Sequence, residues 1–236
     1  MKPKAVFFDF YNTLVRFWPP LDEIQQAACA ELGLKVSKEG IRRGYVRADE
    51  YMSEENAIRS LSERSDQERA DFFAVYEQII LGGAGINASI ALAKDAWIMA
   101  SQVPKDFALF EDVLPGLEML KTRGLVTGLI SNLRRDMPVL CEQLGLSPYL
   151  DFSITSAEAG AEKPHNRVFL AALERAQVDP ADAVHVGDQY KADALGARAV
   201  GITPVLIDRE GWYEHIDDCT RISSLPELDS LLANGL

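Results

Sequence analysis

Short apolar runs alternate with amphipathic segments near the start of the chain and through its second half. The apolar runs have the length of strands and lie at residues 5–8, 125–130, 152–155, 183–186 and 204–207. Helical patterns, some bounded by Pro at the start and Gly at the end, lie at residues 115–124, 138–145, 168–176, 192–200 and 225–232. This alternation predicts an α/β fold built on a doubly wound parallel sheet.

Between the first strand and the second, the pattern is helical. Apolar residues recur there at helical spacing, and no convincing strand interrupts residues 19–104. We therefore expect an α/β core formed by residues 1–15 and 108–236, with an all-helical cap at residues 16–107. A cap inserted at this point would lie above the carboxyl ends of the strands, where it could exclude water and select substrates.

Asp9 ends the first apolar run and is followed at once by a turn signal. The carboxyl end of a parallel strand is where α/β sheets place their chemistry. Three later segments could converge on this carboxylate: Ser131-Asn132, Lys163-Pro164 and Gly187-Asp188 with Asp193. Taken singly, each residue has a plain alternative as a helix cap, a turn or an exposed side chain. Their joint occurrence favours a nucleophile, a hydroxyl anchor, a cation and metal-binding acids.

These segments resemble the four motifs of the haloacid dehalogenase superfamily of hydrolases in residues, order and spacing. They are Asp9-Phe10-Tyr11-Asn12-Thr13, Ser131-Asn132, Lys163-Pro164 and Gly187-Asp188-Gln189-Tyr190-Lys191-Ala192-Asp193. The helical insertion between the first and second motifs is similar to that family's first cap type. The motifs span about residues 5–207, and the resemblance implies a Rossmann-like α/β core.

The resemblance implies a role for each motif residue. Asp9 would be the nucleophile, because a carboxylate can divide one hard displacement into two easier steps through a covalent intermediate. Lys163 would neutralise charge on the nucleophile and the substrate as a compact point charge. Ser131 and the backbone N–H groups around Asn132 would hold a phosphate or carboxylate oxygen. Thr13 would bind the substrate or brace the loop.

A magnesium site is also implied by the resemblance. Asp188 would ligate Mg²⁺ together with Asp9 and the main-chain oxygen of Tyr11, and Asp193 would support this site. Mg²⁺ prefers such all-oxygen surroundings and usually keeps several waters.

Tyr11 departs from the pattern of the phosphatases in this superfamily, which usually carry a second Asp there as the general acid–base. The 2-haloacid dehalogenases carry a Tyr at the matching position. A halide leaves without a proton, whereas an alkoxide leaving from phosphate needs one, and a phenol is a poor base at neutral pH. Tyr11 therefore occupies a catalytic position whose chemistry differs between the two reactions.

The fourth motif favours the opposite interpretation. The dehalogenases work without metal and have smaller polar residues there, whereas Asp188 and Asp193 are both present in this chain. We therefore expect a Mg²⁺-dependent phosphatase of a small phosphorylated metabolite that uses an aspartyl-phosphate intermediate. Two alternatives stay open: a 2-haloacid dehalogenase, and a module that binds phosphorylated ligands or a protein with little turnover.

Composition limits which binding partners and which cellular compartment are expected. The formal charge of −12, from 24 basic and 36 acidic residues, disfavours nucleic acid and leaves a small anionic substrate as the expected ligand. Three widely spaced cysteines show no disulfide framework or metal spacing. The amino terminus lacks a signal-peptide pattern, and the longest apolar stretch, residues 79–93, is too short and broken to span a bilayer. We expect a cytoplasmic protein without membrane contact.

Some residues remain undecided at this stage. Arg42, Arg43 and Arg47 could grip a substrate carboxylate from the cap, but a solvated helix face is the favoured interpretation. His185 stands between two valines and is expected to be a core histidine rather than a ligand. A homodimer stays open, because cap helices often serve as dimer surfaces in the relatives that the motifs resemble.

Overall fold

The computed structural model describes residues 3–235. The chain forms two compact units, a core unit of Met1–Arg16 with Ala108–Leu236 and a helical unit of Phe17–Phe107. The first segment of the core unit ends at Arg16, one residue after the expected boundary at residue 15. The second segment begins at Ala108, the expected position. The chain leaves the core unit after the first strand and returns before the second strand of the main sheet.

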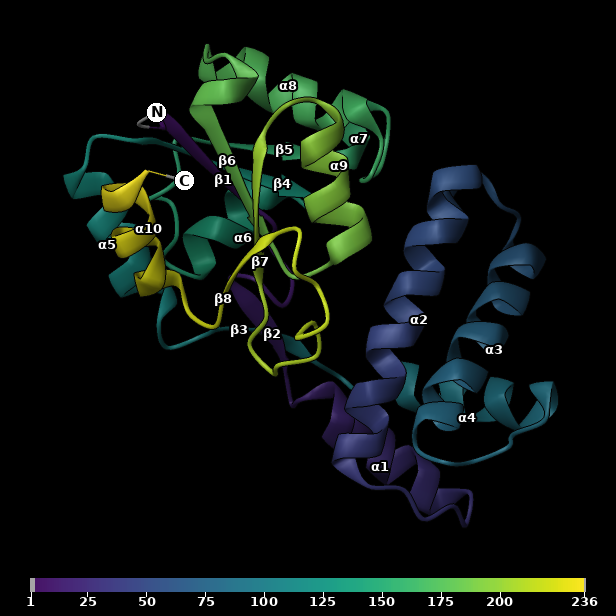
Figure 1. The fold of residues 1–236 in the computed structure, drawn as a ribbon. Coiled ribbons are helices and arrows are strands. Elements are labelled where there is room, and N and C mark those ends of the chain that lie inside the picture. The colour runs from purple at the N-terminus through teal and green to yellow at the C-terminus, as the bar shows by residue number, and fades with distance from the viewer. Residues whose placement is uncertain (1–2, 236) are drawn as a thin grey trace. The chain divides into compact units, whose positions relative to one another are not determined.

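The core unit is built on a six-stranded sheet in the order β5-β4-β1-β6-β7-β8, as Figure 1 shows. The strands are β1 (Ala5–Phe8), β4 (Val126–Ser131), β5 (Phe152–Thr155), β6 (Ala183–Gly187), β7 (Thr203–Ile207) and β8 (Thr220–Ile222). All neighbours pair in parallel. The predicted α/β fold with a parallel sheet is therefore confirmed.

Helices cover both faces of this sheet, with α8 and α9 on one face and α5 and α10 on the other (Figure 1). The core helices are α5 (Val113–Thr122), α6 (Met137–Gln143), α7 (Ser156–Ala159), α8 (Asn166–Ala176), α9 (Gly196–Ala199) and α10 (Leu228–Asn234). Phe169 of α8 packs with Phe7 of β1 and Ile130 of β4 in one buried cluster. Such burial of a large side chain typically stabilises the fold by about 1.5–3 kcal/mol.

Three features of the core differ from the sequence-based expectation. The segment expected as one helix at residues 192–200 is a π-helical turn, Tyr190–Leu195, followed by α9. Strand β8 was not expected, because its three residues are mostly exposed and carry no apolar run. Strands β2 (Val15–Trp18) and β3 (Asp106–Leu109) form a separate two-stranded sheet at the two crossings.

The helical unit contains four long helices: α1 (Leu21–Glu31), α2 (Lys38–Ile58), α3 (Asp66–Gly83) and α4 (Ile90–Gln102). Side-chain caps begin three of them, at Ser37, Ser65 and Ser89, and the cap of α3 is a reciprocal capping box with Glu68. As the pattern predicts, residues 19–104 contain no strand. None of the helices in residues 3–235 has the length and apolar character needed to cross a membrane.

Glycine allows α2 and α3 to approach closely. A Cβ atom added to Gly44 of α2 would lie 2.2 Å from the carbonyl oxygen of Ile80 in α3. Gly83 faces Gly44 from the other helix, and a Cβ there would lie 2.4 Å from the Gly44 Cα. Real Cβ atoms do not tolerate such distances, so both positions require glycine.

A carboxyl group lies inside the helical unit. Glu77 of α3 is fully buried, and its Oε1 accepts a hydrogen bond from the Gln25 side chain of α1. Its Oε2 has no hydrogen-bond partner among the residues that the structure describes. Burial raises the pKa of Glu77 to about 8. The carboxyl is therefore mostly protonated in the folded protein at neutral pH.

Candidate active site

The predicted site residues gather at the carboxyl edge of the central strands. Asp9 directly follows β1, Ser131 ends β4, and Asp188 directly follows β6. Strand β1 lies between the other two, with Phe8 opposite Leu129 on one side and Val186 on the other. The three strands therefore end side by side, at the edge where parallel sheets place their functional groups.

Lys163 joins two of the carboxylates from a buried position. Its ammonium donates to Oδ1 of Asp9 and, over 2.7 Å, to Oδ1 of Asp193. The Lys163 side chain is only 3% exposed, so the ammonium depends on these partners in place of water. The structure thus brings together the predicted nucleophile, the predicted cation and one of the predicted metal-site acids.

Burial and charge act in opposite directions on the pKa values in this cluster. Burial raises the pKa of the Asp9 carboxyl to about 6, although the Lys163 ammonium opposes that shift. Burial also favours the neutral acid at Asp193, but Lys163 and His185 hold the pKa of Asp193 below its usual range. Burial disfavours the Lys163 ammonium, yet the two carboxylates raise the pKa of Lys163 above its usual value. At neutral pH the lysine is charged and both acids are mostly ionised.

His185 is buried in β6 as expected, but it also contacts the site. Its Nε2 lies 2.9 Å from Oδ1 of Asp193, and its ring meets Phe169 edge-to-face. Burial lowers the pKa of His185, so the ring is neutral, and Nε2 carries the proton that it donates to the ionised acid. The sequence offered only a weak signal for this contact: His185 lies two positions before Gly187, on the same face of the strand.

Gly187 makes room for Asp193. A Cβ atom at Gly187 would lie 2.2 Å from Cγ of Asp193, so any larger residue would displace this carboxylate. The second oxygen of Asp193 accepts the backbone N–H of Gln189 over 3.1 Å. Because Lys163, His185 and Gln189 already occupy both of its oxygens, Asp193 is suited to supporting the site rather than to binding a ligand directly.

The acids fit a divalent cation. One oxygen from each of Asp9, Asp188 and Asp193 lies within 4.8 Å of the others. Three carboxylates against the one ammonium of Lys163 leave two negative charges when all four groups are ionised. Oxygen donors with this charge suit Mg²⁺, which would also relieve their mutual repulsion. The main-chain oxygen of Tyr11 as a further ligand stays a prediction.

The nucleophile loop, residues 9–15, is closed by its own backbone. The carbonyl oxygen of Phe10 accepts from the N–H groups of Leu14 and Val15 over 2.9 and 3.0 Å. Asn12 has a left-handed φ of 59°, which lets the chain reverse direction within this short segment. Thr13 is fully buried, and its hydroxyl has no hydrogen-bond partner among residues 3–235. Its role in substrate binding stays a prediction.

Ser131 and Asn132 connect the second motif to the third. The Ser131 hydroxyl accepts the backbone N–H of Leu133 over 3.1 Å. The Asn132 side chain accepts the backbone N–H of Lys163 over 2.7 Å and donates to its carbonyl oxygen over 3.2 Å. This amide therefore holds the lysine loop in place, a role that was not predicted. Substrate contact through Ser131 and the backbone near Asn132 stays a prediction.

The three cap arginines lie on α2 of the helical unit. Arg42 pairs with Asp22 over 2.8 Å, and Arg43 pairs with Glu39 over 3.1 Å. Both arginine side chains are nearly half exposed, and Arg47 is exposed. Pairing with neighbouring acids supports the favoured interpretation of a solvated helix face for Arg42 and Arg43.

Comparison with known proteins shows the family to which this chain belongs. The sequence model of the haloacid dehalogenase-like hydrolase family matches residues 3–201. The human haloacid dehalogenase-like hydrolase domain-containing protein 3 is 33% identical over 210 residues, which cover 86% of this chain and 81% of that protein. The ribulose-1,5-bisphosphate 5-phosphatase of Halopiger xanaduensis is 31% identical over 209 residues, which cover 86% and 84%.

A solved structure supports the fold. The HAD-hydrolase YfnB of Bacillus subtilis, crystallised with bound magnesium, superposes with a TM-score of 0.65. The alignment covers 99% of this chain and 100% of that protein at 15% identity. At this identity the likeness concerns the fold alone.

Proposed function

The chain belongs to the haloacid dehalogenase-like hydrolases, and on that basis we propose that it is a Mg²⁺-dependent phosphatase of a small phosphorylated metabolite. The observation that carries this proposal is the group of three carboxylates, two of which pair with Lys163. Without a cation, Asp9, Asp188 and Asp193 would repel an anionic substrate at close range. With a divalent cation and Lys163, the same group attracts a phosphate.

Asp9 carries the covalent step. Its carboxylate oxygen attacks phosphorus, the bond from phosphorus to the ester oxygen breaks, and the ester oxygen leaves as an oxyanion that takes a proton from water. Water then attacks the aspartyl phosphate, releases inorganic phosphate and restores the carboxylate. With a pKa of about 6, Asp9 is mostly ionised at neutral pH and so available as a nucleophile. Lys163 holds this carboxylate in place and balances part of the charge that gathers on the phosphoryl oxygens.

The metal would be held by Asp9, Asp188 and the main-chain oxygen of Tyr11, with Asp193 behind them. When bound, Mg²⁺ would neutralise charge on the phosphoryl oxygens and on the surrounding carboxylates. Ser131 and the backbone near Asn132 would hold a further oxygen of the substrate.

Tyr11 limits the range of leaving groups. A phenol with an ordinary pKa of about 10 is a weak base at neutral pH, and losing a positioned acid–base typically costs roughly 10²–10⁴-fold in rate. We therefore expect aryl and acyl phosphates, whose leaving groups need little protonation, to react faster than alkyl phosphates.

Two further proposals follow from similarity and charge. The Halopiger xanaduensis relative is named for a phosphorylated sugar, which supports a sugar phosphate as the first class of substrate to screen. The formal charge of −12 disfavours nucleic acid as a partner and, because a local cluster can override the net field, is compatible with a small anionic substrate.

A dehalogenase is the second candidate, and Tyr11 alone favours it. One experiment separates the two reactions: phosphate release from p-nitrophenyl phosphate with Mg²⁺ or EDTA, beside halide release from L-2-chloropropionate. We expect phosphate release that EDTA abolishes. Metal-independent halide release without phosphatase activity would refute the proposal, and no turnover of either probe or of a sugar-phosphate panel would favour a binding module.

A further inference from the structure

Arg209 connects three segments of the core unit that are distant in sequence. Its Nη1 donates to both carboxylate oxygens of Asp112 over 3.0 Å. Its Nη2 donates to the carbonyl oxygen of Thr13 over 2.8 Å. The guanidinium also stacks on the ring of Phe110, 4.0 Å from its centroid. One side chain from the end of β7 thus holds the nucleophile loop and the segment where the chain returns from the helical unit.

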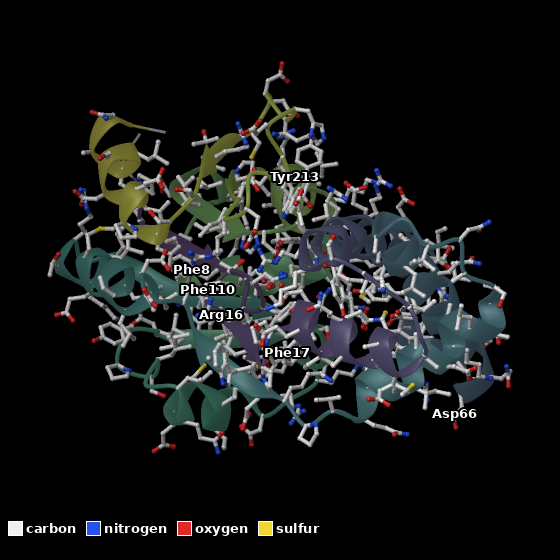
Figure 2. All side chains as sticks on the ribbon, turned by 90° about the horizontal axis from the view of Figure 1, so that it is seen from below. Phe8, Arg16, Phe17, Asp66, Phe110 and Tyr213 are labelled. Carbon is white, nitrogen blue, oxygen red and sulfur yellow. The ribbon has the colours of Figure 1, made fainter. Side chains whose placement is uncertain are left out.

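The surroundings of Arg209 are mostly buried. Its side chain is 15% exposed, and that of Asp112 is 19% exposed. Asp112 also accepts the backbone N–H of Leu225 over 2.8 Å, so the carboxylate is anchored independently of the arginine. A second guanidinium, that of Arg16, lies 5.3 Å from the Phe110 centroid, and Figure 2 shows these two residues beside each other.

The contact with Thr13 links Arg209 to Asp9 through a short stretch of backbone. Thr13 belongs to the nucleophile loop, whose backbone bonds already close residues 10–15 into a single turn. A backbone bond from outside this turn comes from Phe110, whose N–H donates to the carbonyl oxygen of Leu14 over 3.2 Å. Arg209 therefore holds Thr13, and Phe110, on whose ring it stacks, holds Leu14. Both contacts lie in the same loop as Asp9 and Tyr11.

We propose that Arg209 is a positioning residue for the hydrolysis proposed above. It fixes the Thr13 carbonyl and so sets the orientation of the loop that presents the Asp9 carboxylate and the Tyr11 main-chain oxygen. Arginine suits this task because one terminal nitrogen bonds both oxygens of a carboxylate while the other bonds a carbonyl oxygen, and the planar guanidinium stacks on a ring at the same time. A lysine at this position could keep the charge but not this geometry.

The test compares Arg209→Lys and Arg209→Met with a matched control. Arg123→Met removes another arginine that bonds a carboxylate and a carbonyl oxygen, both of Asp229, away from the nucleophile loop. Turnover of p-nitrophenyl phosphate with Mg²⁺ gives kcat and KM. Binding of Mn²⁺, followed by electron paramagnetic resonance, and thermal unfolding provide readouts that do not depend on turnover.

We expect Arg209→Met to lower kcat by about 10- to 100-fold with KM changed less than about 3-fold, because a small misplacement of the nucleophile mainly affects the transition state. Mn²⁺ affinity should fall by about 10-fold, as for the loss of other outer-sphere supports of a metal. Arg209→Lys should recover a part of both losses. Arg123→Met should lower the unfolding temperature alone.

The proposal is overturned if Arg209→Met loses thermal stability while kcat and Mn²⁺ affinity stay within about 2-fold of the wild type. If Arg209→Met does not fold, Arg209→Lys decides by the same criteria. The proposed function can fail separately. In that case the wild type hydrolyses no phosphate ester, and the Mn²⁺ affinities of the variants still show whether Arg209 places the loop.

Discussion

Replacement of Glu77 by Gln in the helical unit should change how stability depends on pH. In the unfolded chain this carboxyl ionises with a pKa of about 4.5, whereas burial raises its pKa to about 8 in the folded protein. The folded state therefore binds more protons between these values, and stability is lost as the pH rises through that window. A glutamine cannot ionise, and its amide oxygen can still accept from Gln25.

The two pKa values give the size of the effect. Between pH 6 and pH 9, the raised pKa of Glu77 costs the wild type about 2.5 kcal/mol of unfolding free energy. The Glu77→Gln variant should not show this loss, so its advantage over the wild type should grow by about this amount. Burial also raises the pKa of Asp49 to about 6, but this carboxyl is common to both proteins and cancels in the difference.

Urea unfolding followed by circular dichroism at pH 6, 7, 8 and 9 measures this difference. The matched control is Glu31→Gln, an exposed glutamate at the end of α1, which should follow the wild type within about 0.5 kcal/mol at every pH. A Glu77→Gln advantage that stays constant across the series would refute the reasoning, because it would mean that the carboxyl has no raised pKa in the folded protein.

The remaining predictions concern the candidate site. Asp9→Asn should fold normally and lose turnover by roughly 10³-fold or more, as measured with p-nitrophenyl phosphate; substantial residual activity in folded protein would exclude Asp9 as the nucleophile. Gly187→Ala should displace Asp193 and destabilise the protein by about 1–3 kcal/mol in urea unfolding. The control Gly82→Ala should not, because a Cβ atom there has no neighbour within 4 Å; equal effects would contradict the close contact between Gly187 and Asp193. Tyr11→Asp should raise the rate with alkyl phosphates relative to aryl phosphates by about 10²-fold, and an unchanged ratio would show that this position is not the acid–base.

The strands that could be predicted are those with continuous apolar runs. β1 and β6 are buried along their whole length and therefore stand out in the sequence. β8 does not stand out, because two of its three residues are exposed and only its pairing with β7 makes it a strand. The π-helical turn at residues 190–195 could not be predicted either. The backbone N–H of Gln189 bonds the Asp193 side chain there, and this bond depends on the folded site.

The site residues with motif positions could be predicted, while their supports could not. Asp9 and Lys163 were named from the sequence, and they form an ion pair although 154 positions separate them. His185, Asn132 and Arg209 bond residues that are not their neighbours in sequence. These contacts therefore form only when the chain is folded. Pattern analysis therefore finds the reacting groups more readily than the residues that hold them.

The short strand at one end of the core sheet has a consequence for how the protein behaves at high concentration. An exposed edge strand can pair with another chain and start aggregation. β8 offers only three residues for such pairing, and the Arg221 guanidinium within it bonds Asp208 at the end of β7 over 3.1 Å. A short, charged edge is a poor template for a further strand, so this end of the sheet resists edge-to-edge association.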